Sequence, residues 1–412
     1  MSIYRLTLLT GLLLALCACG SSGGGPSKSS APGVFSSSEA VVSSSSSESS
    51  VSQSSLVSSS SSAVSMAGMS SVELTREMGV GWNLGNTLEA LGSETAWGNP
   101  ITTPELLQAV KAAGFDTVRI PVAWSRFSDE ASFSIEPAWM ERVHEVVTYA
   151  LDAELYVMLN IHWDGGWMQP TYAEQDYVRG RLAVMWQQIA ERFSAFGSAL
   201  LFACTNEVLV EGDYGTPTEE YYTVQNGFNQ VCVDTIRATG GNNTERFVVV
   251  QGFNTNIDHT LNFFEMPEDP ADDKLLVEVH YYDPYNFTLN PDSQVTQWGD
   301  RAEDASLSEP WANETHVDAQ FGRMKSRFVD QGVGVILGEY GAMSRFQVPW
   351  HEAYRVYWNQ YVTASAVTHG LVPVYWDAGY TGDGGSGLFN RATGEVVYPA
   401  IVEAITRALQ AR

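Results

Sequence analysis

The chain has 412 residues, enough for one large domain or two ordinary ones, and it carries 12 Trp, 18 Tyr and 17 Phe. Its formal net charge of −26 argues against nucleic acid or an anionic lipid surface as a partner, because both would repel it. A neutral sugar would not be repelled, and aromatic rings suit the C–H faces of sugars, although the charge is equally consistent with simple solubility outside the cell.

The first residues predict a lipoprotein signal peptide over residues 1–18. An Arg precedes an apolar run over residues 8–16, which is too short to span a bilayer as an ordinary helix. The run ends in the letters LCACG, which resemble a bacterial lipobox, and the small residue before the second Cys favours Cys19 over Cys17 as the lipidated residue. The glycine that follows, in place of Asp, points to the outer membrane of a Gram-negative bacterium. Ordinary secretion with incidental cysteines is the alternative.

Residues 19–66 form a low-complexity segment, in which 24 of the 45 residues from Ser21 to Ser65 are Ser. Such a segment has too little apolar surface to offset the entropy of ordering, so we expect a disordered linker. It would hold the rest of the chain away from a membrane. After this segment the Ser-rich composition gives way to alternating apolar and amphipathic stretches, and residues 67–412 are expected to form one catalytic domain.

The folded part alternates short apolar runs with longer helical patterns. Most short runs are continuous rather than alternating, as expected for a parallel sheet buried on both faces. Amphipathic helices are predicted over residues 139–151 and 177–193, and Thr103 is the expected N-cap of a helix that Pro104 opens. The predicted strands are Gly81–Leu84, Thr117–Pro121, Tyr156–Ile161, Leu200–Asn206, Phe247–Gln251, Leu275–His280, Val333–Leu337 and Pro373–Trp376.

Eight strands that alternate with helices predict a single α/β domain, a (β/α)8 TIM barrel. An open doubly wound sheet is the structural alternative. That fold usually carries a Gly-rich phosphate turn after its first strand, and the stretch GWNLGNTLEA found here does not match that turn.

Two cysteines fall in the folded part, Cys204 in the fourth predicted strand and Cys232 in a helix that should follow it. Two cysteines do not make a disulfide framework. A bond is possible in an exported protein, but we expect two buried free thiols. CxxC motifs and His-rich clusters are absent from the sequence, so no metal and no cofactor are expected.

Polar and aromatic residues follow one predicted strand after another, and in a barrel of this kind the active site lies at the C-terminal ends of the strands. Two carboxylates across the mouth suit glycosidic cleavage, because one protonates the leaving oxygen and the other attacks the anomeric carbon, roughly 5–5.5 Å apart in retaining enzymes. A single Glu at a strand end is equally well explained by a salt bridge. In chain order the residues are Arg119, His162, Trp163, Asn206, Glu207, His280, Tyr282, Glu339 and Trp376.

The motifs GWNLGNTLEA, RIPVAW, TNE, VHYYDPYNF and GEYGA resemble those of glycoside hydrolase family 5, and most closely its subfamily 4 endoglucanases. The resemblance extends from about Gly79 to the C-terminus. It implies a retaining, endo-acting hydrolase of β-1,4-glucan backbones, with Glu207 as the acid/base and Glu339 as the nucleophile.

The resemblance also implies roles for the residues around the two acids. Arg119 and Tyr282 would support the nucleophile, which Arg119 would keep ionised, and His280 would support the acid/base. The sugar-binding residues would be Asn206 on the 2-hydroxyl group, His162 and Trp376 at the subsite before the cut, and Asn86 in the first motif.

One position departs from the family pattern. Many relatives carry two adjacent His residues after the third strand, and here the second is Trp163. The departure puts in doubt any contact that the second His would make. Trp163 and Trp167 are candidate platforms for sugar rings, with packing under a loop as the alternative.

Subfamily 4 includes enzymes for cellulose derivatives, mixed-linkage glucan and xyloglucan, among which we favour xyloglucan. No module for holding crystalline cellulose is visible, and a tethered enzyme best meets a soluble, branched polymer. A general endoglucanase, a mannanase or a xylanase are the alternatives. A non-catalytic glycan-binding surface lipoprotein is a different class, and it is disfavoured because both acids and their supporting residues are present. We expect a monomer that binds polysaccharide, contacts the membrane only through its N-terminal lipid and does not bind nucleic acid.

Overall fold

The computed structural model describes residues 68–162 and 164–411. The predicted signal peptide, the lipidation site Cys19 and the Ser-rich segment lie outside these residues, as does Trp163. In the part of the chain that is described, no helix is both long enough and apolar enough to cross a bilayer.

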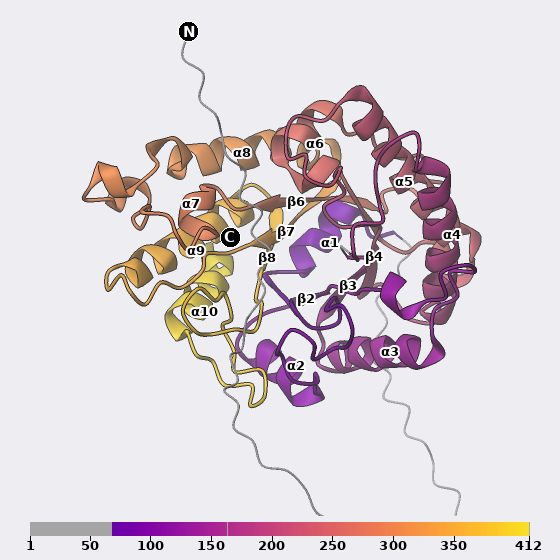
Figure 1. Cartoon of the computed structure of the whole chain (residues 1–412), viewed down its shortest axis with the longest axis horizontal. Coiled ribbons are helices and arrows are strands. Elements are labelled where there is room, and N and C mark those ends of the chain that lie inside the picture. Colours follow the sequence, from indigo (N-terminus) through magenta and orange to yellow (C-terminus); the bar gives the residue numbers. More distant parts are fainter. Residues whose placement is uncertain (1–67, 163, 412) are drawn as a thin grey trace, which may run out of the picture. The chain divides into compact units, whose positions relative to one another are not determined.

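Eight parallel strands close into a barrel in chain order (Figure 1), and β8 completes the ring by pairing with β1. This arrangement confirms the predicted barrel and excludes the open doubly wound sheet. The strands are β1 (Gly81–Asn83), β2 (Thr117–Ile120), β3 (Tyr156–Asn160), β4 (Leu200–Ala203), β5 (Val248–Gln251), β6 (Leu275–Tyr281), β7 (Gly334–Tyr340) and β8 (Leu371–Tyr375).

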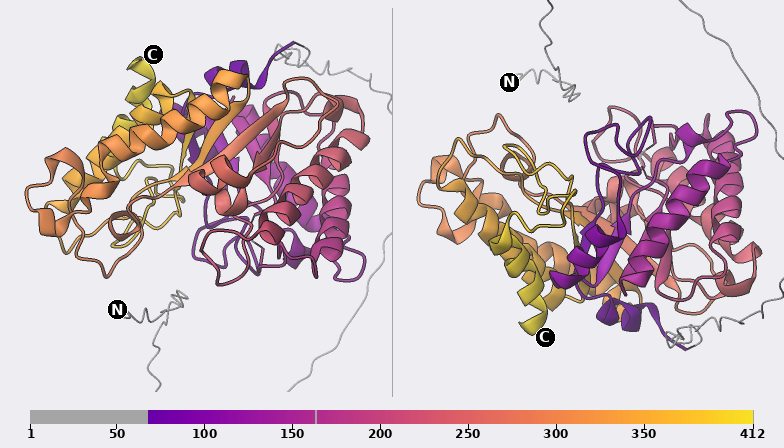
Figure 2. Two further views of the ribbon diagram at one scale, coloured as in Figure 1. Left: turned by 90° about the horizontal axis from the view of Figure 1, so that it is seen from above. Right: turned by 90° about the horizontal axis from the view of Figure 1, so that it is seen from below.

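Helices follow the strands and cover the outside of the barrel (Figure 2). The two predicted amphipathic helices are present as α3 and α4, and Thr103 caps α2 through a hydrogen bond from the amide of Leu106, as predicted. The helices are α1 (Ser71–Glu77), α2 (Pro104–Ala112), α3 (Pro137–Asp152), α4 (Gln175–Arg192), α5 (Glu219–Ala238), α6 (Ile257–Phe263), α7 (Tyr285–Thr288), α8 (Glu314–Arg327), α9 (His351–Thr368) and α10 (Pro399–Thr406).

The barrel interior is apolar in the half nearest the N-terminal ends of the strands, and α1 closes this end. Leu74 of this short helix and Met78, its C-cap residue, pack with inward-facing strand residues such as Ile336. The helix starts with a capping box between Ser70 and Glu73, which satisfies backbone amides at its N-terminus. This floor leaves only the opposite end of the barrel, where the strands finish, open for polar side chains.

A disulfide joins Cys204, directly after β4, to Cys232 on α5. Their Cα atoms are 5.8 Å apart, and both residues are fully buried. The expectation of two free thiols was therefore wrong. The bond depends on how α5 packs against the barrel, which the spacing of the two cysteines in the sequence does not reveal.

Candidate active site

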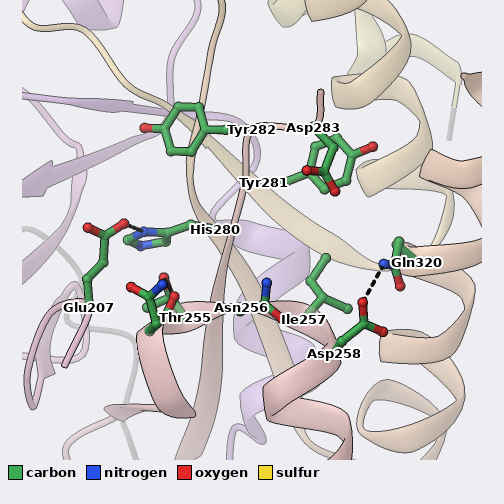
Figure 3. A pocket seen from close by; sticks show the side chains of 11 residues that line it. Glu207, Thr255, Asn256, Ile257, Asp258, His280, Tyr281, Tyr282, Asp283 and Gln320 are labelled. Atoms are coloured by element: carbon green, nitrogen blue, oxygen red, sulfur yellow. Dashed lines mark hydrogen bonds and ion pairs between the residues drawn. The ribbon is translucent and has the colours of Figure 1, made fainter. Parts of the chain in front are cut away.

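Glu207 lies on the loop that leaves β4, and it projects into the mouth of the barrel (Figure 3). The strand ends at Ala203, earlier than predicted, and Glu207 adopts a left-handed backbone with φ of +47°. A left-handed residue cannot continue a strand, and such strained positions cluster at functional sites. The Glu207 amide donates to Gln251 Oε1 at 3.2 Å, so a neighbouring strand holds this turn.

Glu339 lies within β7, which runs past its predicted end to Tyr340. The register of β7 shifts against both of its neighbours near this residue, and His280 of β6 becomes the partner of Glu339. Bulges of this kind are common next to active sites, where they re-aim a side chain. Here they direct Glu339 and His280 toward the same space.

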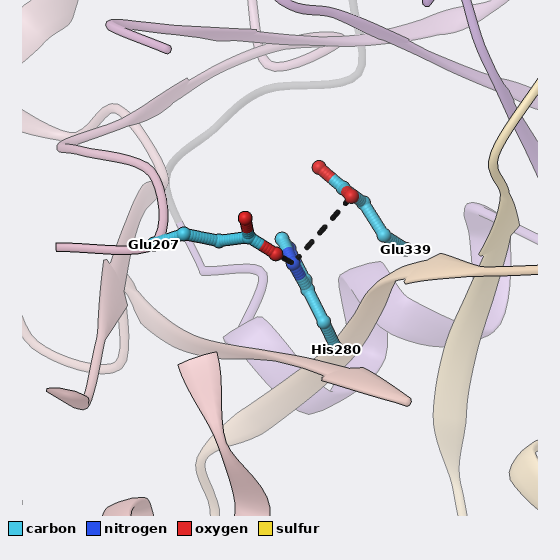
Figure 4. A group of neighbouring side chains, drawn as sticks. All are labelled: Glu207, His280 and Glu339. Carbon is cyan, nitrogen blue, oxygen red and sulfur yellow. Dashed lines mark hydrogen bonds and ion pairs between the residues drawn. The ribbon is translucent and has the colours of Figure 1, made fainter. Parts of the chain in front are cut away.

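The two acids and His280 form one compact group (Figure 4). A carboxylate oxygen of Glu207 and one of Glu339 lie within 4.8 Å of each other. This separation is close to the roughly 5–5.5 Å of retaining glycosidases and well short of the roughly 6.5–9.5 Å that inverting enzymes need for a water molecule. The spacing therefore allows one carboxylate to attack a carbon whose leaving oxygen the other protonates.

Arg119 of β2 is fully buried and holds the nucleophile side of the site together. Its Nη1 donates to Glu339 Oε1 at 2.9 Å and to Asn83 Oδ1 at 3.0 Å. Its Nε forms an ion pair with Glu278 Oε1 at 2.9 Å, and its Nη2 donates to Asn206 Oδ1. All three guanidinium nitrogens of Arg119 thus contact polar groups, and these groups belong to four different strands or the loops that follow them.

Asn206 is left with a free donor by this arrangement. Its carbonyl oxygen accepts from Arg119, whereas its Nδ2 is buried and has no hydrogen-bond partner among the described residues. An unpaired buried donor costs free energy unless a ligand satisfies it. The contact with a substrate hydroxyl that was expected for Asn206 would supply the missing acceptor.

The ionisation of Glu339 reflects opposing influences. Burial, the largest of them, raises the pKa of this carboxyl; the charges of His280 and Arg119 lower it, and the Glu207 carboxylate raises it further. The net direction is upward, and the expectation that Arg119 keeps Glu339 ionised stays a prediction. The ionisation of Glu339 therefore depends on the charges of the groups around it.

His280 connects the two acids. Burial alone would lower its pKa, but the charge of Glu339 and hydrogen bonds to Glu207 and Glu278 raise the pKa of His280 to about 10. As an imidazolium it donates from Nδ1 to Glu207 Oε1 at 2.6 Å and from Nε2 to Glu278 Oε1 at 3.2 Å. His280 therefore lies against the predicted acid/base, where the resemblance implied it.

Tyr282 approaches Glu339 from the other side. Its hydroxyl donates to Glu339 Oε2 at 3.1 Å. Burial and the nearby carboxylates raise the pKa of the Tyr282 hydroxyl, so it stays protonated and remains a donor. With Arg119 on Oε1 and Tyr282 on Oε2, both oxygens of Glu339 are held in place.

His162 and Trp376 form a flat wall beside the acids. Their rings stack with centroids 5.8 Å apart and planes within 7° of parallel. Asn160 Oδ1 accepts from the Val122 amide, which leaves Asn160 Nδ2 to donate to His162 Nδ1 at 3.1 Å. Burial and the charges of Arg119 and His280 hold the pKa of His162 well below its usual value, so the ring is neutral. Because Nδ1 accepts from Asn160, Nε2 carries the hydrogen and can donate a hydrogen bond to a sugar hydroxyl.

Two other predicted sugar-binding residues, Asn86 and Trp167, contact residues other than the two acids. Asn86 lies in the loop after β1 with φ of +54°, and its amide donates to the buried Glu89. Trp167 is partly buried and lies over Arg181, whose Cζ is 4.6 Å from the ring centroid. This is a packing arrangement, and the role of Trp167 as a sugar platform stays a prediction.

A polar hollow of about 200 Å³ opens beside Glu207 and His280 (Figure 3). It extends between the end of β6 and the start of α6. The hollow lies on the side of the acid/base, where a protonated leaving group would depart. Its other lining residues include Thr255, Asp258, Asp283 and Gln320.

The same three side chains are also of the types that bind metal ions. Glu207, His280 and Glu339 are the one set of His, Cys, Asp and Glu side chains among residues 68–162 and 164–411 whose ligand atoms converge to within 4.8 Å. A metal requires the lone pair of a neutral imidazole nitrogen. Both nitrogens of His280 instead donate to carboxylates, so the geometry fits acid–base chemistry better than metal binding.

Sequence reasoning missed four residues of the site. Glu278, Asn83, Gln251 and Asn160 are all fully buried and all hydrogen bond to site residues. Each lies inside a predicted strand rather than after it, on its inner face. A polar residue within an otherwise continuous apolar run was the available signal, because a buried strand tolerates one only where a partner satisfies it.

Comparison with known proteins agrees with the geometry. Residues 83–382 match the family described as cellulase, glycosyl hydrolase family 5. A xyloglucan-specific endo-β-1,4-glucanase from Bacteroides ovatus is 43% identical over 363 residues, which cover 84% of this chain and 71% of that protein. Endoglucanase A from Paenibacillus barcinonensis is 40% identical over 370 residues, which cover 84% of this chain and 92% of that protein.

A solved structure has the same architecture. The Bacteroides ovatus family 5 xyloglucanase in complex with an XXXG heptasaccharide is similar with a TM-score of 0.80 and 42% identity, covering 84% of this chain and 78% of that chain. The family match spans Glu207, Glu339 and the stacked wall of His162 and Trp376. The barrel, the site and the sequence therefore agree, and the chain belongs to glycoside hydrolase family 5.

Proposed function

We propose that this protein is a retaining, endo-acting β-1,4-glucanase whose preferred substrate is xyloglucan. The observation that carries the proposal is the pair of carboxylates at the barrel mouth, with oxygens of Glu207 and Glu339 within 4.8 Å of each other. Their different surroundings give one a role as acid/base and the other a role as nucleophile.

The first step transfers the sugar to the enzyme. A carboxylate oxygen of Glu339 attacks the anomeric carbon, the bond to the glycosidic oxygen breaks, and Glu207 gives its proton to that oxygen. Arg119 and Tyr282 hold Glu339 so that one lone pair faces the carbon. The product is a glycosyl ester on Glu339 and a released chain end.

The second step reverses the role of Glu207. Water attacks the anomeric carbon of the ester, Glu207 takes the proton from that water, and Glu339 leaves as a carboxylate. The Glu207 side chain is 36% exposed, compared with 7% for Glu339, so water reaches the acid/base and not the face of the nucleophile. The anomeric configuration is retained after the two displacements.

The choice of xyloglucan is supported by the relatives. The Bacteroides ovatus relative is named as specific for xyloglucan, whereas the Paenibacillus relative is named only as an endoglucanase. At 43% identity over 363 residues, the relative that is specific for xyloglucan is slightly more similar to this chain than the other, at 40% over 370 residues.

Initial rates of reducing-end release separate the candidate substrates. The purified protein is assayed on xyloglucan, mixed-linkage β-glucan and carboxymethylcellulose at equal mass concentration, with Glu339→Ala as the blank. We expect xyloglucan to be cleaved at least about tenfold faster than the other two. Faster cleavage of the unbranched polymers would make the protein a general endoglucanase, and cleavage of none would point to mannan, xylan or a binding role.

We also propose that the mature protein is a monomer anchored by a lipid on Cys19, in the outer membrane. The letters LCACG after the apolar run and the Ser-rich segment that follows support this location. A Cys19→Ala variant expressed in a Gram-negative host should move from the membrane fraction to the soluble fraction with its activity unchanged. An unchanged distribution would contradict lipid anchoring at this residue.

A further inference from the structure

A third carboxylate, Glu278 of β6, lies beneath the two acids and is not used by the two-step reaction. It has no solvent exposure. Its Oε1 is 2.9 Å from Arg119 Nε and 3.2 Å from His280 Nε2, and its Oε2 accepts from Gln251 Nε2 at 2.6 Å. A buried charge is costly unless it is well paired, and this one has a guanidinium and two hydrogen-bond donors around it.

The position of Glu278 is fixed by its neighbours on both sides. A Cβ atom at position 338 would overlap Glu278 Oε1, so only glycine fits at Gly338, next to Glu339. On the other side, Gln251 bridges two parts of the site, because its Nε2 donates to Glu278 while its Oε1 accepts from the Glu207 amide. The carboxylate therefore cannot move away from His280 without disturbing both acids.

Glu278 is ionised. Burial opposes its charge, but the Arg119 guanidinium and hydrogen bonds from His280 and Gln251 outweigh burial and lower its pKa. A permanent negative charge thus lies on the Nε2 side of the imidazole, opposite the Nδ1 side that faces Glu207. The charged and titratable groups that face His280 from all packed elements are Arg119 of β2, His162 after β3, Glu207 after β4, Glu278 and Tyr282 of the β6 segment, and Glu339 of β7.

We infer that Glu278 is a positioning residue that acts through His280, keeping Nε2 of the imidazole protonated and Nδ1 directed at Glu207, so that one proton is held between His280 and the acid/base until the leaving oxygen arrives. In the resting state this proton lies in the hydrogen bond between His280 Nδ1 and Glu207 Oε1. When the leaving oxygen arrives, the proton passes from Nδ1 to Glu207 and on to the oxygen, and His280 becomes neutral with its remaining proton on Nε2. The water that hydrolyses the ester later returns a proton to the pair.

The test compares two substitutions at one position. Glu278→Gln keeps the size and removes the charge, whereas Glu278→Asp keeps the charge and shortens the side chain. The pH dependence of kcat/KM on the polysaccharide is measured for both, because its alkaline limb reports the loss of the shared proton from the free enzyme.

We expect Glu278→Gln to move the alkaline limb to lower pH by about one unit or more, as loss of a neighbouring opposite charge does. Glu278→Asp should slow the enzyme but leave the limb near its wild-type position. The loss in Glu278→Gln should also be larger on polysaccharide than on an aryl glycoside with an activated leaving group, which needs little protonation. A uniform loss with an unmoved limb would reduce Glu278 to a structural residue and overturn the inference.

A second measurement follows the titration of His280 in the wild-type protein itself. The wild-type protein is labelled with ¹³C-histidine, which introduces only 7 labelled side chains, and the His280 signal is assigned by its loss in His280→Gln. We expect this imidazole to remain protonated above about pH 8, well above the ordinary value for His. Loss of its proton below about pH 7 would overturn the inference.

The kinetic measurements on Glu278 rest on the proposed function. The inference about Glu278 and the proposed function can nevertheless fail separately. If Glu339→Ala still cleaved polysaccharide, the assignment of the nucleophile would fall. The titration of His280 in the wild-type protein and in Glu278→Gln would still decide whether Glu278 controls the imidazole.

Discussion

Glu207 and Glu339 are the same residue type at the tips of two barrel strands, but their surroundings differ. Glu339 lies within a strand, is 7% exposed, and has donors on both oxygens from Arg119 and Tyr282. Glu207 lies on a left-handed turn, is 36% exposed, and has one side-chain donor, His280. A fixed carboxylate suits attack on one carbon, whereas an exposed one can give a proton to a leaving group and later take one from water.

The comparison shows how one chemical group acquires two roles. The side chain itself carries no information about which acid attacks and which protonates. The difference lies in rigidity, access to water and the number of positive or donor groups in contact, all of which the barrel supplies. Substitutions that act on one end of the pair and not the other are therefore the most direct way to test the assignment.

The largest effect is expected from Glu339→Ala, because without a nucleophile the glycosyl ester cannot form. We expect kcat to fall on the order of 10⁴-fold or more, on polysaccharide and on activated aryl glycosides alike. Steady-state rates on both substrates check this. The exposed Glu265 provides a matched control, since Glu265→Ala should retain wild-type activity. Near-normal turnover by Glu339→Ala would remove this residue from the nucleophile role.

A smaller and substrate-dependent loss is expected from Glu207→Ala. Polysaccharide cleavage should fall by about 10² to 10⁴, the usual contribution of a positioned acid. The first step on a substrate with an activated leaving group should be affected much less, which a burst of released aglycone would reveal. Equal losses of this first step on both substrates would count against Glu207 as the acid.

Tyr282→Phe removes one hydroxyl group, and with it the hydrogen bond to Glu339 Oε2. A hydrogen bond to a charged group contributes about 1.5–3 kcal/mol, so kcat should fall roughly 10- to 100-fold. Because the contact is to the nucleophile, the loss should be similar for polysaccharide and activated substrates. Tyr285→Phe is the matched control, since Tyr285 is 59% exposed. A loss confined to polysaccharide would instead link Tyr282 to the acid/base.

The smallest effect on activity is expected at the disulfide, which supports only the Glu207 end of the pair. Cys232→Ser opens a covalent loop with a sequence separation of 28 residues. The free energy of unfolding should fall by about 3 kcal/mol, while the folded enzyme keeps its activity at 25 °C. Denaturant unfolding of the variant and of the wild type, with and without a reductant, measures this. If the reductant leaves wild-type stability unchanged, the two thiols are not bonded in solution.

The fold and the two acids could be predicted because their signals are local. An apolar run followed by Asn206 and Glu207 marks the end of a buried strand, and eight such runs with intervening helices leave little choice of fold. The range of β7 was predicted too short because Gly338 and Glu339 do not look like strand residues. Their place in the strand depends on bulges against β6 and β8, which only the assembled barrel defines.

The features that escaped prediction depend on contacts between distant segments. Glu278 is unremarkable beside His280 in the sequence, and its importance arises from Arg119, which is 159 positions earlier in the chain. The Cys204–Cys232 bond depends on the packing of α5. The raised pKa of Glu339 depends on burial by the whole mouth, which outweighs the one cation that the sequence suggested.

The helix α1 that closes the barrel floor also fixes where the described chain begins relative to the active site. Its first residue is tied to the starts of two strands, because the Ser71 amide donates to the carbonyl of Asp273 and its hydroxyl accepts from the Gly334 amide. The described chain therefore begins at the end of the barrel opposite Glu207 and Glu339. The N-terminal end of the described chain therefore leaves the catalytic mouth free, and a long polymer can cross the mouth without meeting α1.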